Sequence, residues 1–223
     1  MLSFQLFADT YEGTPSVNME EYTRSGRVAI AVKASEGVTH VDRWHAGRAR
    51  EAHAWGLAVI HYHFARPDLG TDPKREAAFF VAIVKPTWRK GDYLWLDFER
   101  GVVRRQDTDQ LWAETFCAEV HRMFGATPII YGSESTLNGS LLSCRVKGER
   151  YAPAKYGGAP SKLAGRKRKW SEQFTDGVQG HEPHSVAGMG PCDLNILSIR
   201  VAAAVRLRTG WRRWRALHPR GKR

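Results

Sequence analysis

The chain has 223 residues, of which 42% are hydrophobic and 26% charged, a balance that excludes a disordered chain and allows one α/β domain with a single core. The formal net charge of +11 indicates an anionic partner such as nucleic acid, lipid headgroups or cell-wall polymer. Eight Trp, seven Tyr and nine Phe form a large aromatic content, which serves packing first and can also line a sugar-binding cleft.

Apolar runs alternate with helical patterns along the first 131 residues. In chain order the predicted elements are a strand at residues 4–7, a strand at 28–32, a helix at 42–55, a strand at 57–62, a helix at 73–84, a strand at 93–96, a helix at 107–124 and a strand at 128–131. Gly56 and Gly125 end two of the helices, Pro73 suits a first turn, and Asp107 or Thr108 is the expected N-cap of the third.

After Gly132 the pattern weakens, and residues 151–154 and 173–174 predict further strands. Strands that alternate with helices are typical of a largely parallel sheet covered by helices. The sequence therefore predicts an α/β fold, a complete or irregular (β/α) barrel, as a single domain over residues 1–199.

The strongest local feature is the segment YLWLDFERG at residues 93–101. Side chains alternate along a strand, so Asp97 and Glu99 point to the same side, with Cα atoms roughly 6.5 Å apart at ~3.3 Å per residue. Both follow the apolar run and therefore lie at the carboxyl end of a strand, which is the catalytic face of a β/α barrel.

Two adjacent carboxylates raise the pKa of one of them, which helps to keep a carboxylic acid protonated near neutral pH. Cleavage of a glycosidic bond needs such an acid to protonate the leaving oxygen. The alternative is a pair of solvated acids with Arg100 as an ion-pair partner, and the spacing alone leaves both interpretations open.

Other carboxylates follow other predicted strands. Asp9 follows the first strand, Glu36 the second, and Asp193 lies in a Gly/Pro-rich loop near the last one. Each by itself could be a helix N-cap or a loop acid, but together they predict a carboxylate-lined cleft at one end of the barrel.

The segment His61-Tyr62-His63 raises the question of a metal site, because some metal-dependent hydrolases place two histidines in this way on a barrel strand. A complete site needs further ligands at later strand ends. If Tyr62 faces the interior, strand alternation directs both histidines away from it, and we expect no metal. The sequence also has no phosphate loop, dinucleotide fingerprint or nucleophile elbow, so we expect no cofactor.

Several stretches together, and in this order, resemble glycoside hydrolase family 25, the Chalaropsis-type lysozymes. They are FADTYEG (residues 7–13), VKASEG (32–37), AWGL (54–57), HYHFARP (61–67), LDFE (96–99), PIIYG (128–132), QFT (173–175) and CDLN (192–195). The resemblance covers residues 4–198 and implies an irregular, TIM-barrel-like fold. It also implies hydrolysis of the β-1,4 bond between N-acetylmuramic acid and N-acetylglucosamine in peptidoglycan.

The resemblance also implies roles for individual residues. Glu99 would be the general acid, and Asp97 would orient or stabilise a charged intermediate formed with the substrate's own N-acetyl group. Asp9 and Asp193 would line the same acidic groove. The residues expected to position sugar or to hold the carboxylates are Lys33, Glu36, Tyr62, Tyr131 and Gln173.

The sequence departs from the family pattern in three places. Only Thr10 and Tyr11 separate Asp9 from the Glu-Gly pair at residues 12–13, which leaves the orientation of Asp9 open. Glu172 stands where an aromatic residue is usual, so a sugar-stacking platform is missing unless Trp170 replaces it. Residues 133–150 match no family stretch.

The positive charge is concentrated in the tail at residues 200–223, which holds nine Lys or Arg and no Asp or Glu. Residues 201–207 are predicted to dock as a final helix. Beyond Gly210 we expect a basic, Trp-bearing amphipathic segment, so that residues 206–223 would attach to an anionic wall polymer or membrane surface. Attraction to phosphate would need only such charge, but no specific nucleic-acid partner is expected.

The three cysteines, Cys117, Cys144 and Cys192, are scattered and odd in number, which fits a reducing compartment. The first residues lack the features of a signal peptide. The resulting hypothesis is a bacteriophage endolysin, made in the host cytoplasm and acting at the cell wall after release. The alternatives are a bacterial autolysin exported by another route, a barrel that binds peptidoglycan without cutting it, and a basic nucleic-acid-binding protein.

Overall fold

The computed structural model describes residues 6–14, 16–100, 106–141, 150–156, 168–169, 171–175, 184–192 and 194–197. Ten strands among these residues form the main sheet: β1 (Leu6–Thr10), β2 (Ala29–Glu36), β3 (His40–Val41), β4 (Ala58–Phe64), β5 (Tyr93–Asp97), β6 (Ile129–Ser133), β7 (Arg150–Tyr156), β8 (Arg168–Lys169), β9 (Ser171–Thr175) and β12 (Leu194–Leu197). Strands β10 (His184–Val186) and β11 (Gly190–Cys192) form a separate hairpin. The helices are α1 (Met19–Arg24), α2 (His45–Ala54), α3 (Pro73–Val84), α4 (Gln106–Phe124) and α5 (Glu134–Asn138), with a 3-10 turn η1 at Pro67–Leu69.

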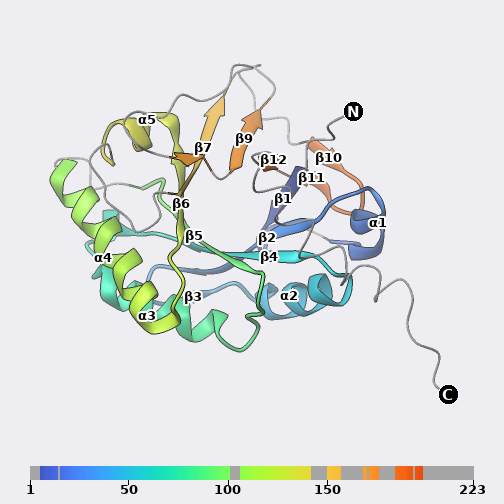
Figure 1. The fold of residues 1–223 in the computed structure, drawn as a ribbon, viewed down its shortest axis with the longest axis horizontal. Coiled ribbons are helices and arrows are strands. Elements are labelled where there is room, and N and C mark those ends of the chain that lie inside the picture. The colour runs from blue at the N-terminus through green and yellow to red at the C-terminus, as the bar shows by residue number, and fades with distance from the viewer. Residues whose placement is uncertain are drawn as a thin grey trace.

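The main sheet is curled and largely parallel (Figure 1). Its neighbours follow the order β1-β12-β9-β7-β6-β5-β4-β2-β3, β8 pairs with β7, and β1 also pairs with β2. Strand β12 is antiparallel to both β9 and β1, whereas β1, β2, β4, β5, β6, β7 and β9 pair in parallel. The predicted α/β class is therefore confirmed, and where an irregular (β/α) barrel was expected the structure has a curled, largely parallel sheet. The predicted helical tail at residues 200–223 lies outside the described residues.

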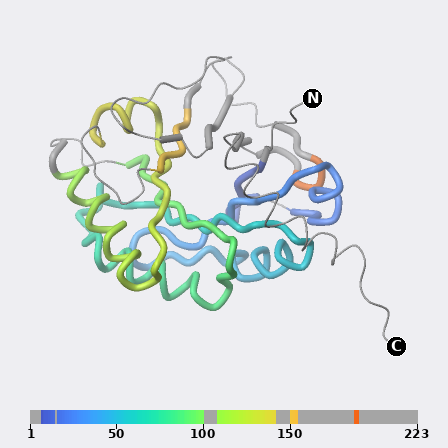
Figure 2. Tube along the Cα trace, viewed as in Figure 1, coloured from blue at the N-terminus to red at the C-terminus, as the bar shows by residue number. Residues whose placement is uncertain are grey.

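Helices α2, α3 and α4 lie on the outer side of the curled sheet (Figures 1 and 2). Helix α3 contacts α4 and β2, and α2 contacts β2 and β4. The side chain of Asp72 caps α3 by accepting hydrogen bonds from the backbone N–H groups of Lys74 and Arg75, and Pro73 occupies the first turn as predicted. Within the described part of the chain, no helix combines the length and apolar character needed to cross a bilayer.

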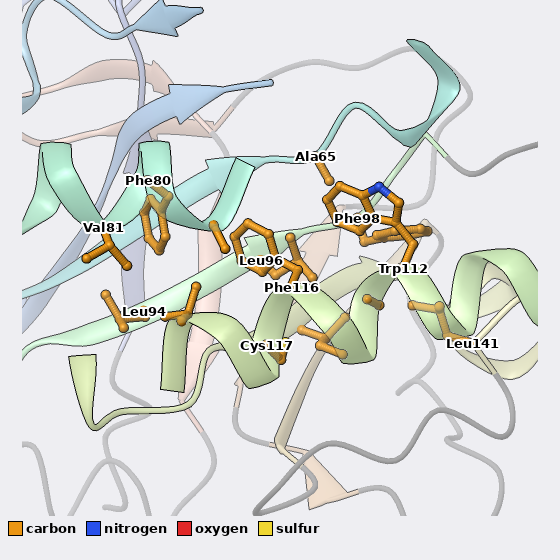
Figure 3. Close-up of a cluster of buried hydrophobic side chains, with 14 of the residues drawn as sticks. Ala65, Phe80, Val81, Leu94, Leu96, Phe98, Trp112, Phe116, Cys117 and Leu141 are labelled. Carbon is orange, nitrogen blue, oxygen red and sulfur yellow. The ribbon is translucent and has the colours of Figure 1, made fainter. Parts of the chain in front are cut away.

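The outward-facing side chains of β5 pack against α3 and α4 (Figure 3). Leu94 and Leu96 contribute from the strand, Phe80 from α3, and Trp112 and Phe116 from α4. The rings of Trp112 and Phe116 stack with centroids 5.6 Å apart. Burial of each such side chain contributes about 1.5–3 kcal/mol to folding, so this layer holds the helices on the sheet.

The inward-facing side chains form a second cluster inside the curl. Strand β5 contributes Tyr93 and Trp95 to it, β1 contributes Phe7, and β6 contributes Ile129 and Tyr131. Because successive residues of a strand point to opposite faces, one strand supplies both clusters. The inner cluster fills the curl below the carboxyl ends of the strands.

Some element boundaries differ from the predicted ones. Strand β2 continues to Glu36, because Ser35 and Glu36 pair with the short strand β3, which the sequence pattern did not predict. Helix α4 begins at Gln106, so the prediction that Asp107 or Thr108 caps it was wrong, and both residues lie inside its first turn. Helix α5, also not predicted, begins where the Ser133 hydroxyl accepts a hydrogen bond from the backbone N–H of Thr136.

A buried polar network joins α2 to β4 and to the start of β5. Nε2 of His45 lies 2.8 Å from Nδ1 of His61, and Nε2 of His53 lies 2.9 Å from a carboxylate oxygen of Asp92. Burial and the neighbouring His61 lower the pKa of His45 from 6.5 to about 3. Burial also lowers the pKa of His61, against the opposing effect of Asp92. This network is therefore adapted to uncharged His45 and His61.

We expect the free energy of unfolding to fall as the pH drops below about 6.5. The unfolded chain protonates His45 near its ordinary pKa of 6.5, but the folded chain does so only near 3, so acid favours the unfolded state. Moving from pH 7.5 to pH 5 should cost about 2 kcal/mol from this group alone. Urea denaturation at the two pH values measures the difference.

His45→Gln is the matched control, because glutamine keeps a hydrogen-bonding side chain but does not titrate. Its free energy of unfolding should depend less on pH than that of the wild-type protein. Equal pH dependence in the two proteins would show that His45 is not the responsible group.

Candidate active site

A cleft of about 250 Å³ opens at the carboxyl ends of the parallel strands. It is lined by Asp9, Tyr11, Lys33, Tyr62, Phe64, Trp95, Asp97, Glu99 and Tyr131. Six of these were predicted as site residues from the sequence. They come together because β1, β2, β4, β5 and β6 are neighbours that end at the same edge of the sheet.

The segment after β5 keeps Asp97 and Glu99 on the same side. The backbone N–H of Phe98 donates to the carbonyl oxygen of Tyr131 at 2.9 Å, so the chain stays extended beyond the last strand residue. Phe98 is fully buried in the outer cluster, and its two neighbours line the cleft. Gly132 permits this close approach, since a β-carbon there would lie 2.9 Å from the Phe98 carbonyl oxygen. Asp97 and Glu99 therefore lie on the same side of the strand, as predicted.

The two acidic side chains stand in different surroundings. Glu99 is exposed, whereas Asp97 is half-buried, and its Oδ1 atom is inaccessible and has no hydrogen-bond partner in the described part of the chain. Burial raises the pKa of Asp97 well above its usual range, and the neighbouring charges of Glu99 and Asp9 raise it further. The charge of Lys33 acts in the opposite direction. An ionised Asp97 is therefore a state of high free energy that a positive charge in the cleft would relieve.

Aromatic side chains form the floor of the cleft. The rings of Trp95 and Tyr131 stack with centroids 5.3 Å apart and an interplanar angle of 10°, and Phe7 meets Trp95 edge-on at 5.6 Å. Tyr62 is buried to 8% exposure, and this burial, with the charges of Asp9 and Asp97, raises the pKa of its hydroxyl well above 10. Tyr62 therefore keeps its proton and can donate a hydrogen bond.

Glu36 and Lys33 form an ion-paired wall beside the carboxylates. Nζ of Lys33 lies 2.7 Å from Glu36 and 5.0 Å from the centre of the Phe64 ring, and Arg66 also binds Glu36 at 2.7 Å. Burial alone would raise the pKa of Glu36, but hydrogen bonds from Lys33 and Arg66 lower it below 4.5. Glu36 itself does not line the cleft and instead holds Lys33 in place.

The two histidines of β4 face away from the cleft, as expected if Tyr62 faces inward. His63 lies between the Ser35 hydroxyl at 2.8 Å and the Glu76 carboxylate at 2.6 Å, and both histidines are fully buried. Their hydrogen-bond partners come from β2, from the outer helices α2 and α3, and from Asp92, which directly precedes β5. Among the residues that the structure describes, no group of three or more His, Cys, Asp or Glu is arranged to hold a metal ion.

Two predicted site residues are not placed. Asp193 lies outside the described residues, as do Trp170 and the basic tail. Gln173 belongs to β9, opposite Asn195 of β12, but its side chain also lies outside what the structure describes.

Three cleft residues were missed in the sequence. Strand alternation could have identified Trp95, two residues before Asp97, and Phe64, two residues after Tyr62. Tyr11 follows β1, and no sequence periodicity indicates where its side chain lies.

Known proteins resemble this chain in sequence pattern and in fold. The model of the family described as Glycosyl hydrolases family 25 matches residues 8–182. No curated protein sequence gives a significant match.

Several solved structures share the fold. A bacterial lysozyme from Streptomyces coelicolor has a TM-score of 0.77 at 20% sequence identity, over 93% of this chain and 98% of that one. A family 25 lysozyme from Aspergillus fumigatus has a TM-score of 0.74 at 22% identity, over 93% and 100%. The catalytic domain of the endolysin ply40, from a bacteriophage of Listeria monocytogenes, has a TM-score of 0.70 at 20% identity, over 92% and 98%.

Replacing Asp97 with asparagine should stabilise the protein at pH 7. Because the folded protein raises the pKa of Asp97, its stability falls as the pH rises from the ordinary value of 3.8 through the raised pKa. Asp97→Asn removes this cost, and we expect a gain of about 1 kcal/mol at pH 7 that disappears at pH 3.5. Urea denaturation of both proteins at both pH values measures the gain.

Asp68→Asn serves as the control. Its hydrogen bonds with Arg66 lower the pKa of Asp68, so this variant should gain no stability at pH 7. If Asp97→Asn also gains no stability at pH 7, or loses as much as Asp68→Asn does, the electrostatic account of Asp97 is wrong.

Proposed function

Because this chain belongs to family 25 of the glycosyl hydrolases, we propose that it is a lysozyme that cuts bacterial peptidoglycan. The scissile bond is the β-1,4 bond between N-acetylmuramic acid and N-acetylglucosamine. The observation that carries the proposal is the pair Asp97 and Glu99, which share one cleft but differ in burial. Glycoside hydrolysis requires two carboxyl groups with different tasks, and different surroundings are how proteins separate such tasks.

Glu99 acts as the general acid. Its exposed carboxyl group gives its proton to the glycosidic oxygen as the bond from that oxygen to the anomeric carbon breaks. The substrate's N-acetyl oxygen takes the place of the leaving oxygen on that carbon. Water later attacks the anomeric carbon and breaks its bond to the N-acetyl oxygen, and the Glu99 carboxylate takes a proton from that water. Each carboxyl group is then back in its starting state.

Asp97 assists by stabilising positive charge. When the carbonyl oxygen of the substrate's N-acetyl group attacks the anomeric carbon, a cationic intermediate forms beside Asp97. The buried carboxylate, unfavourable in the empty cleft, becomes favourable next to that cation. Interactions that are stronger in the transition state than in the free enzyme are the ones that accelerate a reaction.

The remaining cleft residues position the sugar. The stacked rings of Trp95 and Tyr131 offer an apolar face, Tyr62 offers a hydroxyl donor, and Lys33 offers a cation. Asp9 contributes negative charge that favours the cationic intermediate. The family resemblance extends this set to Asp193 and Gln173.

We further propose that the enzyme is a bacteriophage endolysin, made in the host cytoplasm and acting on the wall after release. Support comes from the shared fold with the catalytic domain of ply40 and with the CTP1L endolysin. Residues 206–223, rich in arginine, would attach to anionic wall polymer or to a membrane surface.

Glu99→Gln should nearly abolish the release of new muramic-acid reducing ends from purified peptidoglycan. Glutamine keeps the shape of the side chain but has no proton to transfer, and loss of a general acid costs about 10²- to 10⁴-fold in rate. Mass spectrometry of the released fragments identifies the new ends.

The control is Glu119→Gln, which removes a half-buried carboxylate paired with Arg122 on α4, away from the cleft, and should leave the rate unchanged. If the wild-type protein is folded but releases no new ends from several wall types, the hydrolase proposal is wrong. Retained binding under those conditions would identify a glycan-binding protein instead.

A further inference from the structure

Large apolar side chains are exposed beside the cleft. Among the described residues, five large hydrophobic side chains are strongly exposed, and three of them, Tyr11, Val41 and Trp44, are 50%, 47% and 47% exposed. Tyr11 lines the cleft, while Val41 belongs to β3, and Trp44 directly precedes α2. We call this set the shoulder. Clustered exposed apolar side chains are a common mark of a binding surface.

One buried carboxylate joins the two aromatic segments of the shoulder. Asp42, 2% exposed, accepts a hydrogen bond from the backbone N–H of Glu12 at 2.6 Å and another from that of Trp44 at 2.9 Å. The backbone segments that carry Tyr11 and Trp44 are therefore linked through the Asp42 side chain. Nε2 of His40 also lies 3.4 Å from Oε1 of Glu12, between the same two segments.

Further contacts fix the backbone and the ring of Tyr11. The guanidinium of Arg48, on α2, donates to the carbonyl oxygens of Tyr11 and Thr14 at 2.6 Å each. The Tyr11 ring lies over Gly13, where a β-carbon would overlap it. With its backbone fixed by a buried arginine and its exposed ring resting on a glycine, Tyr11 is prepared for contact with a ligand, because less conformational freedom remains to be lost on binding.

The cleft by itself is small for its substrate. Pockets that bury most of a drug-sized ligand measure about 300–1,000 Å³, and this cleft measures about 250 Å³. A glycan strand that crosses the cleft must therefore rest on surface beyond it. The shoulder continues the cleft, because Tyr11 belongs to both.

We propose that the shoulder is an extended glycan subsite, in which Tyr11 and Trp44 stack against successive sugars of the strand that leaves the cleft. Arg43, whose guanidinium lies 5.2 Å from the centre of the Trp44 ring, steadies that ring and adds a positive charge beside the strand. This inference rests on the proposed function, since it concerns the substrate of the same cleft.

The test measures binding without cleavage. Every protein carries Glu99→Gln. The probes are peptide-free peptidoglycan glycan strands of two lengths, a tetrasaccharide and chains of roughly twenty or more sugars, so that only the long chains extend well beyond the cleft. Trp44→Ala and Tyr11→Ala should each weaken binding to the long chains about three- to tenfold, and Trp44→Ala should weaken tetrasaccharide binding less. Trp44→Phe should restore most of the affinity.

Leu111→Ala is the matched control, because Leu111 on α4 is an equally apolar side chain that is 66% exposed. Its binding to long chains should match that of the parent. Thermal midpoints identify any variant that is misfolded, and Trp44→Phe then decides the question. Long-chain affinities of Trp44→Ala and Leu111→Ala that agree within twofold, with both proteins folded, would overturn the subsite.

Failure of the proposed function has a different signature. It would appear as an absence of new reducing ends with intact Glu99, whatever the shoulder variants do. Weaker long-chain binding by Trp44→Ala would still support the subsite in that case.

Discussion

Strand alternation is the constraint on which the rest of this structure depends. Along β5, the outward residues Leu94 and Leu96 pack under the outer helices, while Trp95 and Asp97 face the interior of the curl. The same division on β4 directs Tyr62 into the cleft and His61 toward Asp92. A shift of one residue in β5 would exchange these sets, placing Asp97 in the apolar layer and leucines in the cleft.

Buried polar groups are paired differently on the two faces of the sheet. On the outer face, buried histidines have hydrogen-bond partners, and His63 binds Ser35 and Glu76. Burial by itself would raise the pKa of Asp92, but hydrogen bonds from His53 and His61 lower that pKa to about 2. These groups tie helices to strands. Buried polar groups that find partners cost little and specify one arrangement of the elements.

On the inner face, charge is less well matched. Asp97, Asp9 and Glu99 share a cleft in which Lys33 is the cation that acts on Asp97, and Glu36 with Arg66 holds that lysine in place. The cleft therefore has an excess of negative charge and a carboxylate of raised pKa. Such local instability is tolerable because the layer of Phe80, Trp112 and Phe116 outside supplies the packing that keeps the sheet in shape.

The sequence by itself determined the α/β class, the main strands and helices up to β6, and the side of β5 on which Asp97 and Glu99 lie. These features depend on periodicity and on residues close in sequence, so they can be derived without knowing the neighbours. Six of the nine cleft residues were also identified: Asp9, Asp97 and Glu99 because the carboxyl ends of parallel strands meet at one edge, and the other three through the family resemblance.

Only the tertiary structure decided the rest. The antiparallel placement of β12, the extension of β2 by pairing with β3 and the role of Glu36 behind Lys33 depend on partners distant in sequence. The shoulder is the clearest case, since Asp42 links the segments of Tyr11 and Trp44. No local sequence pattern predicts a hydrogen bond between residues 30 positions apart. Such contacts arise when the sheet curls and brings separate loops to the same edge.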